Sequence, residues 1–141
     1  MRKFEWIEHP SDVGFKAYGR SLAEAFENAA LALFEVMVDT SKVEPKRQVE
    51  FELEAEDEEA MLYDWLDKLI YYHDAEGLVF SKFEVKLERT GKGFKLKGKA
   101  WGEEFNREKH PERTAVKAMT YHMMEIKQEG DYFTVQAVVD I

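Results

Sequence analysis

The last two residues of the chain place two carboxylates side by side. Asp140 carries one on its side chain, and Ile141 carries the terminal carboxylate. They close the segment 132–141, in which apolar and polar residues alternate and Val, Phe, Tyr and Thr are frequent. This pattern predicts a β-strand with one side facing a core. If that strand is central, two negative charges are held in one place, and a positive group is expected to balance them.

Asp12 is the third carboxylate that could belong to this site. It ends a proline-containing turn at 9–12, and one interpretation is that it only caps this turn. The other is that Asp12 meets Asp140 and Ile141, where three carboxylates would repel one another strongly. A divalent cation would remove that repulsion, and an all-oxygen ligand set favours Ca²⁺ or Mg²⁺ over Zn²⁺. The spacing of the residues leaves both interpretations open.

Four more residues are candidates for a functional role. Asp39 follows a predicted helix, where an acid is unfavourable against the helix dipole; the alternative is a loop acid that only ends the helix. His9 and His110 each precede a proline, which predicts ordered turns. Lys117 belongs to a polar and aromatic group just before the final hairpin.

Composition excludes several classes of function. The net charge of −9 argues against direct, tight binding to nucleic acid. There is no cysteine for disulfides, thiol chemistry or zinc, and no apolar run long enough to cross a membrane. The chain lacks a Gly-rich phosphate loop and the GxSxG and HExxH motifs, and its first residues do not resemble a signal peptide. We expect one cytoplasmic domain over residues 1–141 that is not an enzyme.

Hydrophobic periodicity then predicts the elements that must position these residues. Ser21 and Glu24 form a capping-box sequence, and Asp57 is a second expected helix cap. The expected order is strands at 4–8 and 13–18, a helix at 22–38, a strand at 49–56, a helix at 58–73, a hairpin of strands 78–89 and 94–101, and a hairpin of strands 119–128 and 132–141. The order predicts an α+β fold, with antiparallel or mixed β-sheets and two amphipathic helices packed between or against them.

Short motifs along the whole chain occur in a specific order. They are His9 with Asp12-Val13-Gly14, Leu22 with Glu24-Ala25-Phe26, Ala29-Ala30, Trp65-Leu66, Asp74 with Glu76, Phe83-Glu84-Val85, Gly102-Glu103, His110, Val116-Lys117-Ala118, Thr120-Tyr121-His122 and Asp140-Ile141. As a set they resemble the archease family. The resemblance implies a small α+β sandwich that binds calcium, with Mg²⁺ or Mn²⁺ as alternatives. It also implies a protein cofactor of an RtcB-type RNA ligase in tRNA splicing, which promotes guanylylation and multiple turnover of the ligase. Some members are associated with a chaperone-like role toward tRNA methyltransferases.

Residue by residue, the resemblance implies that Asp12, Asp140 and Ile141 are the metal ligands. Asp39 and Lys117 would be a functional acid and base nearby, with His9 and His110 near the same site. One departure is Asn106, where the family pattern leads us to expect an aspartate. A metal-dependent hydrolase built on Asp12 and Asp140 is a third possibility, which the absence of a nucleophile and a leaving-group acid disfavours.

Overall fold

The computed structural model describes residues 2–7 and 12–141 and has two helices and eight strands in its described part. The helices are α1 (Leu22–Met37) and α2 (Glu58–Glu76), and η1 (Thr40–Lys42) is a short 3₁₀ turn. The strands are β1 (Phe4–Ile7), β2 (Asp12–Gly19), β3 (Arg47–Ala55), β4 (Leu78–Thr90), β5 (Gly93–Glu104), β6 (Ala118–Met119), β7 (Glu125–Glu129) and β8 (Tyr132–Asp140). The expected α+β class is confirmed.

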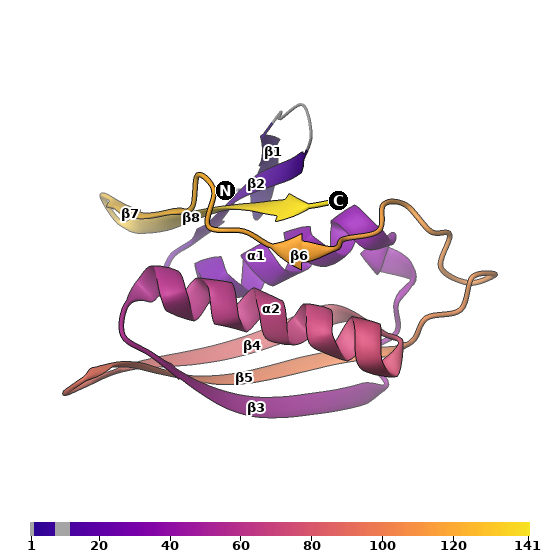
Figure 1. Ribbon diagram of the computed structural model, residues 1–141, viewed down its shortest axis with the longest axis horizontal. Helices are drawn as coiled ribbons and strands as arrows, with labels where there is room; N and C mark the ends of the chain where they lie inside the picture. The colour runs from indigo at the N-terminus through magenta and orange to yellow at the C-terminus, as the bar shows by residue number, and fades with distance from the viewer. Residues whose placement is uncertain (1, 8–11) are drawn as a thin grey trace.

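The strands form two sheets with the helices between them, as Figure 1 shows. One sheet has the order β1-β2-β8-β6, and β7 also pairs with β8. The other has the order β3-β5-β4. Every strand pair is antiparallel. Each sheet has one apolar face, and these two faces and the two amphipathic helices are buried against one another, which is the expected sandwich arrangement.

The core joins both sheets and both helices in one cluster of buried side chains. Trp65 of α2 belongs to this cluster and is fully buried, and its indole N–H donates to the Phe26 carbonyl of α1 over 3.0 Å. The ring lies directly above Gly98 of β5, where an added Cβ would come within 2.5 Å of it. Neither helix in the described part has the length and apolarity to cross a membrane. The contacts of Trp65 with Phe26 and with Gly98 hold the two helices against each other and against the three-stranded sheet.

Both helices begin where the caps were expected. The Ser21 hydroxyl accepts from the Glu24 N–H (3.0 Å), and Asp57 accepts from the Ala60 N–H (2.8 Å). The predicted end of the second helix at residue 73 is wrong, because α2 continues to Glu76. Residues 74–76 tolerate helical geometry, and Gly77, with φ of 67°, is the first residue to leave it.

The single strand expected at 119–128 is interrupted. It forms β6 and β7, which both pair with β8, and a turn at 120–124 separates them. The Thr120 hydroxyl donates to the Val138 carbonyl (2.7 Å), and Met123 has φ of 55°. A side chain therefore bonds to β8 at this point, and the backbone turns away from the sheet. As a result five strands follow α2 where four were expected.

Candidate functional site

Asp12 and Asp140 lie directly opposite each other on neighbouring strands. The antiparallel register of β2 and β8 pairs Asp12 with Asp140 and Val13 with Val139. Val139 is fully buried in the core, so the alternation of side chains puts both aspartates on the outer face of the sheet. Both are half-exposed. Two like charges directly opposite each other destabilise a sheet unless a positive group balances them.

Ile141, the third predicted metal ligand, directly follows Asp140 at this end of the sheet. Its side chain is partly buried and packs against the core, which fixes the position of Ile141 next to Asp140. In the described part of the chain no group of three His, Cys, Asp or Glu side chains could hold a metal ion. The predicted set has two such side chains here, Asp12 and Asp140, and takes its third member from Ile141. All of its donors are oxygens, which suits a hard cation.

Lys117 reaches the same end from the other side of β8. Ala118 of β6 is the register partner of Asp140, and the Lys117 N–H donates to the Asp140 carbonyl over 2.8 Å. Continuing the register by one residue places Lys117 opposite Ile141. The Lys117 residue is exposed. The structure thus brings four of the seven predicted site residues together, and we call Asp12, Asp140, Ile141 and Lys117 the carboxylate tip.

The connection 105–117 carries Lys117 past the end of α1. The N–H groups of Arg113 and Thr114 donate to the carbonyls of Met37 (2.9 Å) and Val36 (3.0 Å). These bonds satisfy carbonyls that a helix end leaves without a partner. The C-terminus of the chain and the C-terminal end of α1 lie on the same side of the molecule in Figure 1. The end of α1 is therefore part of the support of the carboxylate tip.

Asp39 lies just beyond this end of α1. Its carboxylate caps η1 by accepting from the Ser41 N–H (3.0 Å) and the Ser41 hydroxyl (2.6 Å). One of its oxygens is 4.0 Å from the Arg113 guanidinium. The two bonds from Ser41, followed by the charge of Arg113, lower the pKa of Asp39. The carboxylate is thus a fixed anion that holds the turn after α1, as in the interpretation of a structural loop acid.

His110 is completely buried and bonds to a different part of the molecule. The Asn106 N–H donates to its Nδ1 (2.9 Å), so Nδ1 carries a lone pair and the ring proton is on Nε2. Nε2 donates in turn to the Glu103 carboxylate of β5 (2.9 Å). His110 therefore anchors the connection 105–117 to the three-stranded sheet. The structure does not show it as a member of the carboxylate tip.

Glu103 is the residue with the most partners near this connection, and the sequence had suggested no role for it. Besides His110 it accepts from the Glu44 N–H (2.9 Å) and from the Lys109 ammonium (2.9 Å). Burial raises the pKa of Glu103, but these hydrogen bonds and the charge of Lys109 outweigh it and lower the pKa to about 2. Glu103 is thus an ionised hub that holds three separate segments together.

The turn between residues 106 and 110 explains why an asparagine is tolerated at position 106, where an aspartate was expected. The Asn106 N–H serves His110, and its side-chain oxygen accepts from the Glu108 N–H over 2.9 Å. An aspartate could accept the same bond, so the substitution preserves the turn. His9, the remaining predicted residue, lies outside the described residues.

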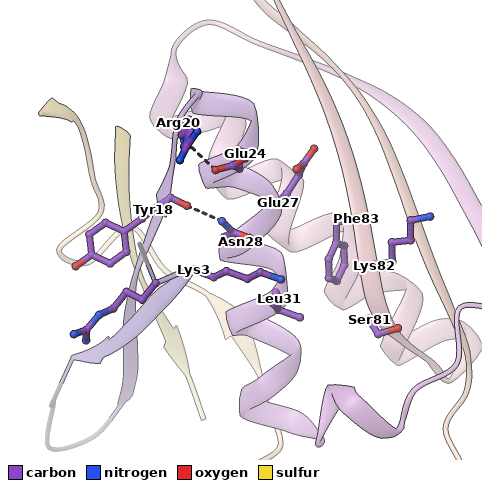
Figure 2. A pocket seen from close by; sticks show the side chains of 11 residues that line it. Lys3, Tyr18, Arg20, Glu24, Glu27, Asn28, Leu31, Ser81, Lys82 and Phe83 are labelled. Carbon is purple, nitrogen blue, oxygen red and sulfur yellow. Dashed lines mark hydrogen bonds between the residues drawn. The ribbon is translucent and has the colours of Figure 1, made fainter. Parts of the chain in front are cut away.

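A hollow of about 450 Å³ lies far from the carboxylate tip, between the edges of the two sheets (Figure 2). It is at the other end of β2, since Tyr18 lines it and is six residues from Asp12, or about 20 Å along a strand. Glu27 of α1 faces β4 across this hollow and accepts from the Val85 N–H over 2.8 Å. Burial, and then the charges of Glu24 and Glu84, raise the pKa of Glu27.

We therefore expect Glu27→Gln to raise the melting temperature by about 2 °C at pH 7. A carboxyl with a raised folded pKa destabilises the protein above that pKa, and the glutamine oxygen can still accept from Val85. The gain should disappear below the ordinary pKa of 4.5, where wild-type Glu27 is protonated in both states. Thermal unfolding at pH 7 and pH 4 measures this gain. Equal melting temperatures of the variant and the wild type at pH 7 would contradict the prediction.

Comparison with known proteins identifies the family. A profile of the archease protein family matches residues 4–141. The chain is 54% identical to the protein archease of Sulfurisphaera tokodaii over 141 residues, and 51% identical to that of Pyrococcus abyssi over 142 residues. Both alignments cover all of each chain. These relatives carry the name of a protein and not of an enzyme.

Solved structures agree with the sequence comparison. The solution structure of a protein from Methanobacterium thermoautotrophicum is 48% identical, covers all of both chains and superposes with a TM-score of 0.89. The crystal structure of a Thermotoga maritima archease, described as a possible chaperone, has a TM-score of 0.62 over all of this chain and 98% of that one. At 24% identity that second likeness concerns the fold alone. With full-length matches in sequence and in structure, this chain belongs to the archease family.

Proposed function

We propose that this protein is a non-enzymatic activator of an RtcB-type tRNA-splicing RNA ligase, and that the carboxylate tip is its working part. The observation that carries the proposal is the register of Asp12 against Asp140, next to the terminal carboxylate of Ile141. Family membership supports the choice of partner. The proposal extends to the cation, for which Ca²⁺ is the first choice, with Mg²⁺ and Mn²⁺ as alternatives.

In this proposal the residues of the tip have separate tasks. Asp12 and Asp140 hold the cation from adjacent strands, and Ile141 packs into the core so that its carboxylate stays in place. Lys117 supports β8 through its main-chain bond to Asp140 and brings an exposed ammonium to the same end. A bound cation would neutralise the opposed carboxylates. The stiffened tip would then enter the nucleotide pocket of the ligase and help to arrange its metal ions or the GTP triphosphate.

The test is ligase guanylylation and multiple turnover with variants of the tip. Asp12→Ala, Asp140→Ala and deletion of Ile141 are each expected to reduce the stimulation at least tenfold. The two substitutions each remove one carboxylate ligand, and the deletion moves the terminal carboxylate to Asp140 and removes the side chain that anchors it. Asp131→Ala is the matched control, since Asp131 is an exposed aspartate in the turn at the other end of β8. Full stimulation by all three tip variants would overturn the proposal.

A chaperone-like binding module for tRNA methyltransferases is the second candidate. It is favoured by exposed large apolar side chains, namely Trp6, Tyr71, Tyr121 and Met123. This activity would need no cation. Protection of a methyltransferase from aggregation to the same extent in calcium and in chelator would support it, and the absence of protection in both would exclude it.

A further inference from the structure

An aromatic pair lies on the surface beside β6. Tyr121, in the turn at 120–124, stacks on Tyr63 of α2 with ring centroids 4.3 Å apart and planes 9° apart. Tyr121 nevertheless keeps 57% of its surface exposed, and Met123 keeps 46%. The Tyr63 hydroxyl donates to the Met119 carbonyl of β6 (3.5 Å). Two large apolar side chains are therefore held outward at the edge of the five-stranded sheet.

The turn that presents these side chains is fixed by bonds to β8. The Thr120 hydroxyl donates to the Val138 carbonyl (2.7 Å), and the Gln136 amide donates to the Met123 carbonyl (2.8 Å). Met123 has φ of 55°, a conformation that L-residues other than Asn and Asp seldom adopt. The sheet therefore holds the aromatic surface in its exposed position before any partner binds.

The start of α2, beside this pair, is strongly acidic. Residues 56–67 contain no Lys or Arg and six acids: Glu56, Asp57, Glu58, Glu59, Asp64 and Asp67. Within the described ranges none of the six forms an ion pair. Several acids elsewhere do pair with a basic residue of the chain; Glu52 of β3, for example, lies 3.4 Å from Lys95. This surface is thus acidic without internal compensation.

Two other aromatic rings, those of Tyr71 and Trp101, already have a cation from the chain. Lys68 lies 5.1 Å from the ring centre of Tyr71, and Lys82 lies 4.7 Å from that of Trp101. Among the described residues no Lys or Arg lies over Tyr121. Burial raises the pKa of Tyr121, and nearby carboxylates, Asp64 foremost, raise it further. The ring therefore stands in a negative field that would attract a cation from outside.

We propose that Tyr63, Tyr121, Met123, Asp64 and Asp67 form a docking surface for a basic protein partner that presents an arginine. The guanidinium would stack on the open face of Tyr121 while the aspartates pair with its N–H groups. Tyrosine and methionine are enriched at such contacts. A second copy of this chain, with its net charge of −9, would be repelled, and so would a nucleic acid backbone.

This surface is close to the carboxylate tip along the chain. Ala118, at the start of β6, pairs with Asp140, and Tyr121 follows three residues later. A partner bound at the docking surface would therefore lie beside the tip. The inference rests on the proposed function only for the choice of ligase as the partner in the test.

The test measures the dissociation constant for a purified RtcB-type RNA ligase, with stimulation of the ligase as a separate readout. Tyr121→Ser is expected to weaken binding at least tenfold, as is usual for an aromatic residue central to an interface. Tyr71→Ser is the matched control and is expected to stay within twofold, because Tyr71 is equally exposed (55%) but already lies under Lys68. The double variant Asp64→Asn/Asp67→Asn should also weaken binding and reduce its dependence on salt.

A charge-matched control, Glu50→Gln/Glu52→Gln on β3, changes the net charge equally and is expected to bind normally. Wild-type binding by Tyr121→Ser and by the Asp64/Asp67 double variant would overturn the docking surface but leave the tip proposal standing. Loss of binding in these variants, with normal stimulation by Asp12→Ala, would support the docking surface and overturn the tip. No binding by the unaltered protein would overturn both.

Discussion

Calcium at one hundred times its dissociation constant is expected to raise the melting temperature of this protein by about 8 °C. A ligand that binds only the folded state at this concentration adds about 2.7 kcal/mol to the free energy of unfolding. For a chain of 141 residues, 1 kcal/mol corresponds to about 3 °C. Thermal unfolding with calcium and with a chelator measures the shift without any ligase, so it tests the cation site independently of the proposed activity.

Two variants make this result specific to the opposed aspartates. Asp12→Asn and Asp140→Asn should each reduce the calcium shift to below about 2 °C, because each removes a charged ligand. In chelator both variants should be at least as stable as the wild type, since the like-charge pair across β2 and β8 is gone. Asp131→Asn serves as the control and should keep the full shift. A full calcium shift in both variants would mean that the cation binds elsewhere.

Magnesium and manganese in the same experiment identify the preferred ion. Calcium accepts six to eight oxygens in flexible geometry, whereas magnesium requires a near-ideal octahedron and keeps several waters. The carboxylate tip has two side chains and one terminal group on adjacent strands, so water must complete the coordination of any of these ions. A larger shift with Mg²⁺ or Mn²⁺ than with calcium would change the assigned ion and leave the site unchanged.

The sequence predicted the elements well where local patterns determine them. The alternation at 132–141 marked β8, and Ser21 and Asp57 marked the starts of both helices. These signals act within a few residues, since a cap or an alternating face forms from near neighbours. The end of α2 was a local error of three residues, since Gly77 marks it, but the error in the final hairpin arose where a distant group decides the outcome. The break between β6 and β7 depends on the bond from Thr120 to Val138, which no local pattern indicates.

The same distinction applies to the candidate site. Residue types alone identified Asp140 and Ile141 as a pair of carboxylates. Whether Asp12 lies next to Asp140 depends on which strands pair. These residues are separated by most of the chain, and the sequence left both interpretations of Asp12 open. The contact of Glu103 with Glu44 is likewise long-range, and the contact of Glu103 with His110 closes a loop that no periodic pattern marks; neither was predicted. Strand pairing and loop anchoring thus required the structure.

Glu103→Gln is expected to lower the free energy of unfolding by about 3 kcal/mol at pH 7, or the melting temperature by about 9 °C. The Glu103 carboxylate is only 11% exposed and accepts from His110, Lys109 and the Glu44 N–H. A glutamine offers one oxygen, so the buried N–H of His110 competes with the other donors. Leaving a buried donor without an acceptor costs far more than the loss of a surface ion pair. The control is Glu104→Gln. Glu104 is the exposed neighbour of Glu103, so its substitution should change the free energy of unfolding by less than about 0.5 kcal/mol.

The pH dependence should confirm that the ionised form of Glu103 is responsible. Its folded pKa of about 2 lies below the ordinary value of 4.5, so its stabilisation is complete above pH 4.5 and is lost as the pH falls toward 2. We expect the wild type to lose about 2 kcal/mol from this group over that range, allowing for partial solvent screening. The Glu103→Gln variant has no such carboxylate, so the difference in free energy of unfolding between the wild type and the variant should decrease steadily as the pH falls. Denaturant unfolding at pH 7, 4 and 3 measures this difference. A difference that does not change with pH would show that Glu103 stabilises the fold by packing and not by charge. Because this hub anchors the connection that carries Lys117 to Asp140, its loss should also loosen the carboxylate tip.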